Sequence, residues 1–212
     1  MPYVFIHGLG QSAAGWKETV SRLPDGVREA SVCPELFAPS LEAETGYPAL
    51  YSAFAAYCGR LERPLDLCGL SLGGVLALHY AVEHPEAVRS MALLGAQFKM
   101  PRALLKLQNV LFGLMPESAF RETGLGKRAM IRLTDSMADL DFSGMLDRVR
   151  CPVLVMCGEK DRANLRASRQ LERLLPAARL CVIPGAGHAL NADAPGALAA
   201  RLSEFYEDIR RG

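Results

Sequence analysis

The sequence lacks the features that mark several classes of protein. It contains no run of about 18 apolar residues, the length that predicts a membrane-spanning helix. Its amino terminus enters an apolar stretch that has no basic residues before it and is too short for a secretory signal. Neither charge is in excess, since 24 Lys and Arg stand against 23 Asp and Glu. We therefore expect a small-molecule substrate, with neither nucleic acid nor a membrane as the main partner.

The cysteines lack the spacing of a metal site or a redox motif. There are six of them, and no two form a C-x-x-C pair. Cys68, Cys151, Cys157 and Cys181 lie in or beside apolar strand-like runs, where a reduced cysteine behaves as a small buried hydrophobe. Buried, unpaired cysteines are typical of a reducing compartment. We expect a cytoplasmic protein that uses no metal and no organic cofactor.

The sequence does contain an alternation of short apolar runs with segments of helical length. The stronger apolar runs lie at residues 3–6, 65–68, 90–94, 151–157 and 179–183, with a weaker one at 27–32. The helical segments lie at 12–23, 47–60, 72–83, 165–175 and 195–210. This order predicts an α/β fold, with a mostly parallel sheet of about six strands and helices on both faces.

One segment, residues 98–145, interrupts this alternation. It has apolar residues at helix-compatible spacing and no strand-like run. We expect a small helical insertion at 98–145 that acts as a lid, between two parts of the core at 1–97 and 146–212. From Lys99 to Leu133 it carries seven basic residues against Glu117 and Glu122. This excess either steers an anionic ester or an acyl carrier, or forms an ordinary solvated face.

A candidate nucleophile, Ser71, lies between an apolar run and a helical segment. It is the centre of Gly69-Leu70-Ser71-Leu72-Gly73, the G-x-S-x-G pattern of a sharp strand-to-helix turn. Such a turn forces the serine into a strained conformation and brings backbone so close that only glycine fits on either side. It also places the serine at the amino end of a helix, where the dipole favours negative charge.

A serine hydroxyl needs a base, and the chain has four histidines. His188 follows the apolar run at 179–183 in a glycine-rich loop, from which its imidazole could point across the edge of the sheet. A base in turn needs a carboxylate that orients it. Asp161 follows the run at 151–157, at the sheet edge where ligands bind in open α/β folds. Glu159 is its nearest rival, and a helix N-cap is its alternative role.

The negative charge of a tetrahedral intermediate requires two backbone N–H donors. The amide of Leu72 directly follows the candidate nucleophile and supplies one. The second is expected from Leu9, in the His7-Gly8-Leu9-Gly10 loop at the end of the first apolar run. His7 is then expected to fix this loop rather than to act as a base.

In the order Ser71, Asp161, His188, with the His7–Gly10 loop before them, the chain resembles the α/β-hydrolase superfamily. The resemblance covers nearly the whole chain apart from the insertion. Members of that superfamily usually have two more strands before the His-Gly loop, so it implies a shortened sheet here with the first strand near an edge. It also implies a catalytic triad of the three residues and an oxyanion hole formed by Leu9 and Leu72.

These residues predict a serine hydrolase that cleaves a small-molecule carboxylic ester or thioester through an acyl-enzyme. We expect Leu9, Gln97, Leu111 and Leu114 to bind the substrate. Two alternatives remain open. The same triad serves carbon–carbon bond hydrolysis, lyase or acyl-transfer chemistry in proteins that resemble this superfamily. The fold also serves as a ligand-binding protein without catalysis. We expect a monomer, or a homodimer that pairs through an exposed sheet edge.

Overall fold

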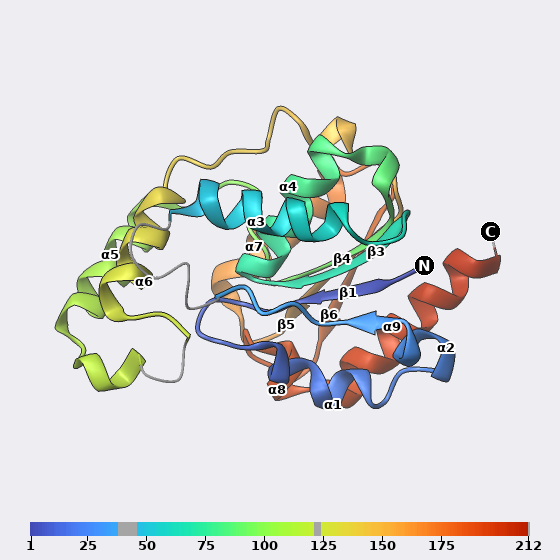
Figure 1. Ribbon diagram of the computed structural model, residues 1–212, viewed down its shortest axis with the longest axis horizontal. Helices are drawn as coiled ribbons and strands as arrows, with labels where there is room; N and C mark the ends of the chain where they lie inside the picture. The colour runs from blue at the N-terminus through green and yellow to red at the C-terminus, as the bar shows by residue number, and fades with distance from the viewer. Residues whose placement is uncertain (38–45, 121–123, 212) are drawn as a thin grey trace.

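The computed structural model describes residues 1–37, 46–120 and 124–211, and in these a single parallel sheet forms the centre (Figure 1). Its strands are β1 (Tyr3–Ile6), β2 (Ser31–Val32), β3 (Leu65–Leu70), β4 (Val88–Leu94), β5 (Val153–Gly158) and β6 (Ala178–Ile183). They lie in the order β2-β1-β3-β4-β5-β6, and every neighbouring pair is parallel. The predicted fold class and strand number are confirmed, and β1 lies one strand from the edge.

Two layers of helices cover the sheet. One face carries α3 (Tyr47–Gly59), α4 (Leu72–Glu83) and α7 (Arg162–Leu174), and the other carries α1 (Lys17–Val20), α2 (Asp25–Glu29), α8 (Leu190–Asp193) and α9 (Pro195–Arg211) (Figure 1). Short 3-10 turns lie at Ala13–Trp16, Pro85–Ala87 and Leu146–Arg148. None of the helices within the described ranges is long and apolar enough to cross a bilayer.

The continuous apolar runs of the sequence reflect burial on both faces of this sheet. Successive side chains of a strand point to opposite faces. In β1, Val4 and Ile6 belong to the core under α3 and α4, whereas Tyr3 and Phe5 belong to the core under α1 and α9. Both positions must therefore be apolar, and the alternation of a one-sided sheet is absent.

Two predictions about the secondary structure of the first 32 residues need correction. The segment predicted as a strand at 27–32 begins with residues 27–29 in the short helix α2, and only Ser31 and Val32 pair with β1. Pro24 has a helix-compatible φ of −55° and its carbonyl accepts from the amides of Val27 and Arg28, so the turn starts there. The helix predicted at 12–23 is a 3-10 turn followed by the single turn α1.

Residues 98–145, here called the inserted segment, leave the sheet after β4 and return before β5. Their described part forms α5 (Arg102–Leu114), the 3-10 turn η4 (Glu117–Phe120) and α6 (Lys127–Ser136). An isolated bridge between Lys99 and Asp141 joins the two ends of the segment. Helices α5 and α6 pack on each other and stand at one end of the long axis of the molecule (Figure 1).

A buried ion pair links strands of the sheet near their amino-terminal ends. Asp66 of β3 is fully buried, and Arg89 of β4 donates to it from Nε at 3.0 Å and also from Nη2. Ser90 Oγ donates to the same carboxylate at 2.6 Å, and Arg89 reaches the hydroxyl of Tyr3 on β1 at 3.2 Å. The Asp66–Arg89 pair thus connects three neighbouring strands.

Replacing Arg89 by Met should destabilise the protein by about 3–5 kcal/mol, because it leaves the buried Asp66 carboxylate without its counterion. Urea unfolding followed by circular dichroism measures the change. Arg22→Met is the matched control, since the Arg22–Glu18 pair is exposed and should cost less than about 1 kcal/mol. Equal effects of the two substitutions would contradict the structural role of the buried pair.

Candidate active site

Ser71 occupies the strained turn that its sequence motif predicts. It joins β3 to α4 with φ 53° and ψ −114°, and it is the one residue other than glycine with a positive φ in the described chain. Such a conformation costs about 1–3 kcal/mol and persists only where its surroundings hold it. The Ser71 amide donates to the carbonyl of Leu94 on β4 at 2.8 Å, and the Ser71 carbonyl accepts from Val75 at 3.0 Å.

The two glycines of the motif are required by close backbone approaches. A Cβ on Gly69 would collide with the Gly73 carbonyl, and a Cβ on Gly73 would collide with the Ile6 carbonyl of β1. Helix α4 is thereby pressed against the end of β1. Gly8 of the next loop also approaches Ser71, because a Cβ on Gly8 would lie 3.4 Å from the Ser71 Cβ. The turn and the His7–Gly10 loop thus form one packed unit.

Asp161 and His188 meet at the carboxyl edge of the sheet. His188 Nδ1 donates to Asp161 Oδ2 at 2.7 Å, with the Asp161 side chain 5% exposed and that of His188 46% exposed. Burial raises the pKa of the Asp161 carboxyl, but hydrogen bonds from His188 and Asn164 outweigh it and hold the pKa below its usual value. The carboxylate therefore stays ionised and keeps the proton of His188 on Nδ1.

Glu159, the rival carboxylate, is engaged elsewhere. Its Oε2 accepts from the backbone amide of Gly185 at 2.8 Å. Asp161 is also the N-cap of α7, its alternative role, because its Oδ1 accepts from the Asn164 amide at 3.3 Å. The cap fixes this carboxylate at the end of β5, on the side that faces His188.

His7 fixes the loop beside Ser71. It is fully buried, its Nδ1 donates to the Gly8 carbonyl at 3.0 Å, and its Nε2 accepts from the Leu36 amide at 3.2 Å. Burial lowers the pKa of His7, which keeps it neutral and suited to one donated and one accepted bond. This imidazole holds the backbone around Leu9 in place.

Leu9 and Leu72, whose amides are the expected oxyanion donors, lie in the loop after β1 and directly after Ser71 in the chain. Leu72 begins α4, so its N–H is one of the first four of a helix and has no intrahelical partner. The Leu9 N–H donates to no acceptor in the described ranges. The side chains of both residues line the same cavity as Ser71.

That cavity, of about 150 Å³, brings the predicted residues together. Ser71 and His188 line it with Leu9 and Gln97, and the inserted segment contributes Met100, Pro101, Leu104, Leu105, Gln108, Thr134 and Met137. No hydrogen bond joins Ser71 Oγ to His188 within the described residues, and such bonds often tighten only when a substrate is bound.

Two of the residues expected to bind substrate do not line this cavity. Leu111 and Leu114 are 53% and 79% exposed, and neither lies in the cavity wall. They lie on the outer side of α5, and Leu104 and Leu105 occupy the cavity wall instead. Helical spacing identified the helix, but it could not tell which of its faces turns inward.

Asn164 is a site residue that sequence analysis missed. Its Nδ2 lies 2.9 Å from both carboxylate oxygens of Asp161 and 3.2 Å from His188 Nδ1. Its own side-chain oxygen accepts from Gln97 Nε2 at 2.7 Å. Gln97, Asn164 and Asp161 thus form a chain of polar contacts from the cavity wall to His188. The only feature of the sequence that could have pointed to Asn164 is its position three residues after Asp161.

A second polar contact ties the loops on the other side of the site. The amide groups of Gln11 and Asn191 bond to each other twice, at 3.1 Å in both directions. Asn191 lies in α8, shortly after His188 in the chain, and Gln11 directly follows the His7–Gly10 loop. The loop that carries Leu9 and the loop that carries His188 are therefore fixed relative to each other.

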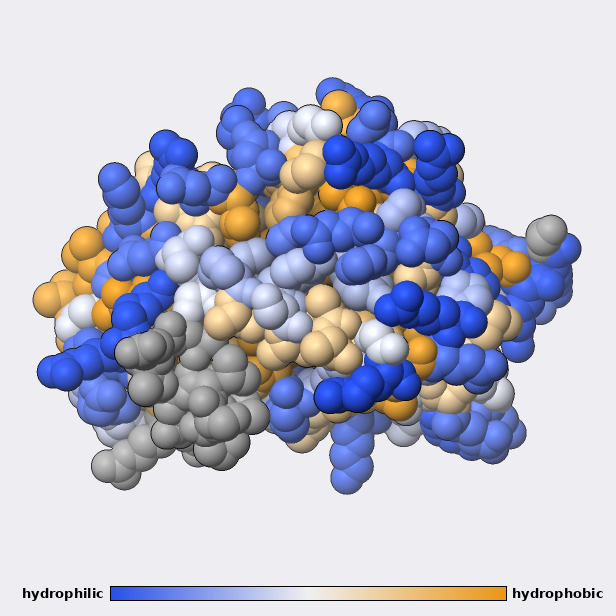
Figure 2. All heavy atoms as spheres, turned by 45° about the horizontal axis from the view of Figure 1, so that its top comes forward, coloured by the Kyte–Doolittle hydropathy of each residue, from blue (hydrophilic) through white to orange (hydrophobic). Residues whose placement is uncertain are grey.

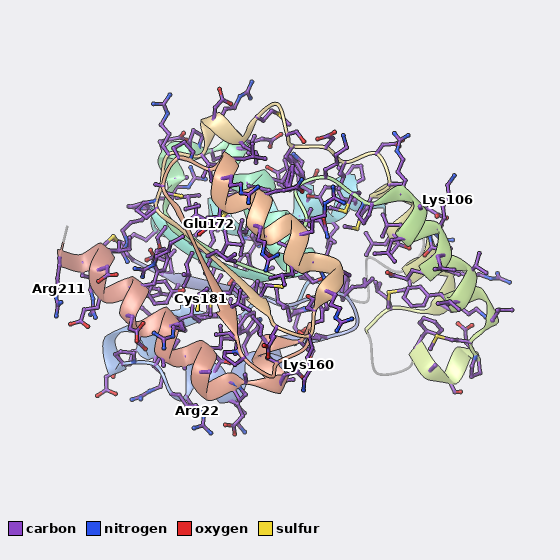
Figure 3. The ribbon with its side chains drawn as sticks, turned by 180° about the vertical axis from the view of Figure 1, so that it is seen from behind. Arg22, Lys106, Lys160, Glu172, Cys181 and Arg211 are labelled. Carbon is purple, nitrogen blue, oxygen red and sulfur yellow. The ribbon has the colours of Figure 1, made fainter. Side chains whose placement is uncertain are left out.

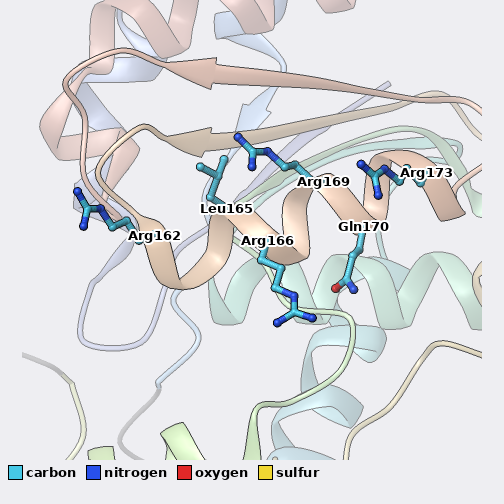
Figure 4. A pocket seen from close by; sticks show the side chains of 6 residues that line it. All are labelled: Arg162, Leu165, Arg166, Arg169, Gln170 and Arg173. Atoms are coloured by element: carbon cyan, nitrogen blue, oxygen red, sulfur yellow. The ribbon is translucent and has the colours of Figure 1, made fainter.

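A larger hollow of about 390 Å³ lies along α7 and has a different character (Figure 4). Its lining comes from one helix and consists of Arg162, Leu165, Arg166, Arg169, Gln170 and Arg173. It contains no nucleophile and no general base. The smaller cavity at Ser71 is the candidate active site.

Comparisons with known proteins agree with this fold. The profile of the Alpha/beta hydrolase family matches residues 3–201. The pimeloyl-[acyl-carrier protein] methyl ester esterase of Neisseria meningitidis serogroup A is 28% identical, with 96% of this chain and 76% of that protein covered. The esterase of the same name from Aromatoleum aromaticum is 27% identical, with 99% and 98% covered. The enol-lactonase of Burkholderia xenovorans LB400 has a TM-score of 0.82 at 15% identity, over 97% of this chain and 91% of that one.

The contacts of Asn164 generate a prediction about the site. Asn164→Ala should raise the pKa of Asp161, because burial remains while one of the two side-chain donors to the carboxylate is lost. Looser positioning of His188 should also lower the rate at which a fluorophosphonate labels Ser71, by roughly 10- to 100-fold. A carbon NMR titration of the Asp161 carboxyl and intact-mass kinetics measure the two effects. Gln170→Ala, on an exposed turn of α7, is the control. Unchanged titration and labelling in Asn164→Ala would contradict the assigned role.

Proposed function

The chain belongs to the alpha/beta hydrolase family, and from that membership together with the geometry around Ser71 we propose that it is a serine hydrolase of carboxylic esters or thioesters. The observation that carries the proposal is the assembly of Ser71, Leu9, Leu72 and His188 around one cavity, with Asp161 bonded to His188 at 2.7 Å. The esterases named among its relatives support the choice of ester over other substrates.

In the proposed reaction, Ser71 Oγ attacks the carbonyl carbon of the ester while His188 Nε2 takes the hydroxyl proton. The carbonyl oxygen becomes an oxyanion, which accepts hydrogen bonds from the amides of Leu9 and Leu72. His188 then gives its proton to the departing alcohol or thiol, and Ser71 remains acylated. Water, deprotonated by His188, attacks the acyl-enzyme and releases the carboxylic acid and free Ser71.

Asp161 contributes without exchanging protons with the substrate. Its carboxylate stabilises the imidazolium that forms on His188 in both steps and keeps the ring in the orientation that presents Nε2. The depressed pKa of Asp161 suits this role, since the carboxyl must stay ionised through the cycle. Asn164 acts as a positioning residue for the same carboxylate.

The cavity favours an ester with one small group beside the scissile bond. At about 150 Å³ it is smaller than the roughly 300–1,000 Å³ of sites that enclose drug-sized ligands. A methyl ester, the group in the name of the Neisseria meningitidis relative, fits this size.

We propose that residues 98–145 act as the lid of the cavity, because α5 and α6 supply Leu104, Leu105 and Thr134 to its wall.

Ser71→Ala should lower the turnover of p-nitrophenyl acetate by at least about 10⁴-fold, because members of a triad act as a unit. Stopped-flow absorbance measures the rate, and denaturation curves verify that the variant folds. Ser118→Ala, an exposed serine of the inserted segment, should keep the wild-type rate. Undiminished turnover in Ser71→Ala would refute the proposal. A slow rate with every ester, combined with rapid labelling of Ser71 by a fluorophosphonate, would favour lyase or carbon–carbon bond chemistry on the same triad.

A further inference from the structure

Helix α5 of the inserted segment turns an apolar face to solvent. Nine large apolar side chains are exposed in the described residues, and six of them lie between Leu104 and Met115. Leu107, Val110 and Leu114 are 57%, 61% and 79% exposed. The space-filling view shows hydrophobic atoms gathered at the end of the molecule where this segment lies (Figure 2). Monomeric proteins rarely expose apolar side chains in such a cluster without a partner.

The spacing of these residues places them on a single side of the helix. Leu107, Val110 and Leu114 follow one another at three and four positions, and Ala103 and Leu111 continue the same row. We call this row, Ala103, Leu107, Val110, Leu111 and Leu114, the outer face of α5. Helix α5 buries none of its residues, which is unusual for a helix with so many apolar side chains.

The opposite side of α5 contains the polar contacts that hold the helix to the protein. Asn109 Nδ2 donates to Asp135 Oδ1 at 2.5 Å, and Asn109 Oδ1 accepts from the Thr134 hydroxyl at 2.5 Å. Lys127 Nζ donates to the carbonyls of Gly113 and Met115 at the carboxyl end of α5. The inner side of α5 therefore combines these polar contacts with Leu105 and Phe112, which pack against the core, whereas the outer face stays largely exposed. The outer face is not needed for packing within the chain.

Basic side chains outnumber acidic ones on the inserted segment. Its described residues carry six Lys and Arg against Glu117, Asp135, Asp139 and Asp141. Arg121 and Glu122, from the predicted charge excess, lie outside the described residues and cancel in sign. Asp139 and Asp141 at the base of the segment pair with Arg102 and Lys99. Lys106 stands on α5 itself, at the end of the molecule opposite Arg211 (Figure 3).

We propose that the outer face of α5 docks on an anionic lipid surface. A helix with an apolar face and basic neighbours lies in the interface of a bilayer, where the apolar groups enter the acyl region and the cations meet anionic headgroups. A second copy of the chain would match the apolar groups but would bring cations toward cations. The lipid surface satisfies both properties of the face.

The position of the face links docking to the cavity. Leu104 is 45% exposed beside the outer face and also lines the cavity that contains Ser71. In the proposal, an acyl chain that leaves the lipid reaches the candidate active site past Leu104. This delivery of a lipid-borne ester rests on the proposed function, whereas docking itself does not.

Sedimentation with vesicles tests the docking without any catalytic readout. The wild-type protein should sediment with vesicles of phosphatidylglycerol and phosphatidylcholine, and much less with vesicles of phosphatidylcholine alone. The double variant Leu107→Gln/Val110→Gln should lower the partition coefficient by roughly tenfold or more, since each side chain withdraws apolar area from the interface. Leu174→Gln/Val182→Gln is the matched control, because these two residues are 50% and 38% exposed on other elements.

Retained binding in the control and lost binding in the α5 variant would support the proposal. Equal binding of all three proteins, or binding by none, would overturn it. A homodimer seen by light scattering that Leu107→Gln/Val110→Gln dissociates, with no vesicle binding, would also overturn it in favour of a second copy. Turnover of soluble p-nitrophenyl acetate by each variant separates this outcome from a failure of the proposed function, since the acetate needs no lipid.

Discussion

The close packing of the Ser71 turn against the end of β1 is the constraint on which the rest of the site depends. Gly69 and Gly73 allow backbone contacts that any side chain would block, and the contact of Gly73 with Ile6 brings the His7–Gly10 loop next to the serine. The positive φ of Ser71 is energetically unfavourable, so it requires this surrounding structure. The turn places Ser71 at the carboxyl edge of the sheet, where it lines one cavity with Leu9, Leu72 and His188.

Polar contacts around this turn convert a sheet edge into a rigid site. His7 fixes one loop through two backbone bonds, the Gln11–Asn191 pair joins that loop to the one bearing His188, and Asn164 holds Asp161 from the opposite side. Each of these bonds is partly buried, where an unmade hydrogen bond is costly. Three loops from distant parts of the chain therefore keep one arrangement around Ser71.

The two sides of helix α5 in the inserted segment face different surroundings, the cavity on one side and solvent on the other. Its inner side provides Leu105 and Gln108 to the cavity wall and Asn109 to α6. Its outer side is apolar and largely exposed. A helix held by hydrogen bonds and by few apolar contacts opens more easily than a core helix. This arrangement suits the two roles proposed for the segment, a lid over Ser71 and a surface that docks on lipid.

The sequence by itself determined the parallel sheet, the order of its elements and the positions of Ser71, Asp161 and His188. Apolar runs buried on both faces and a glycine-flanked serine are local patterns that follow from sterics and burial. Only the tertiary structure decided that Gln97 bonds to Asn164 and so joins the polar contacts of Asp161, because that bond links residues 67 positions apart. It also decided that Leu111 and Leu114 face outward, since a helical apolar period does not specify which side meets the core.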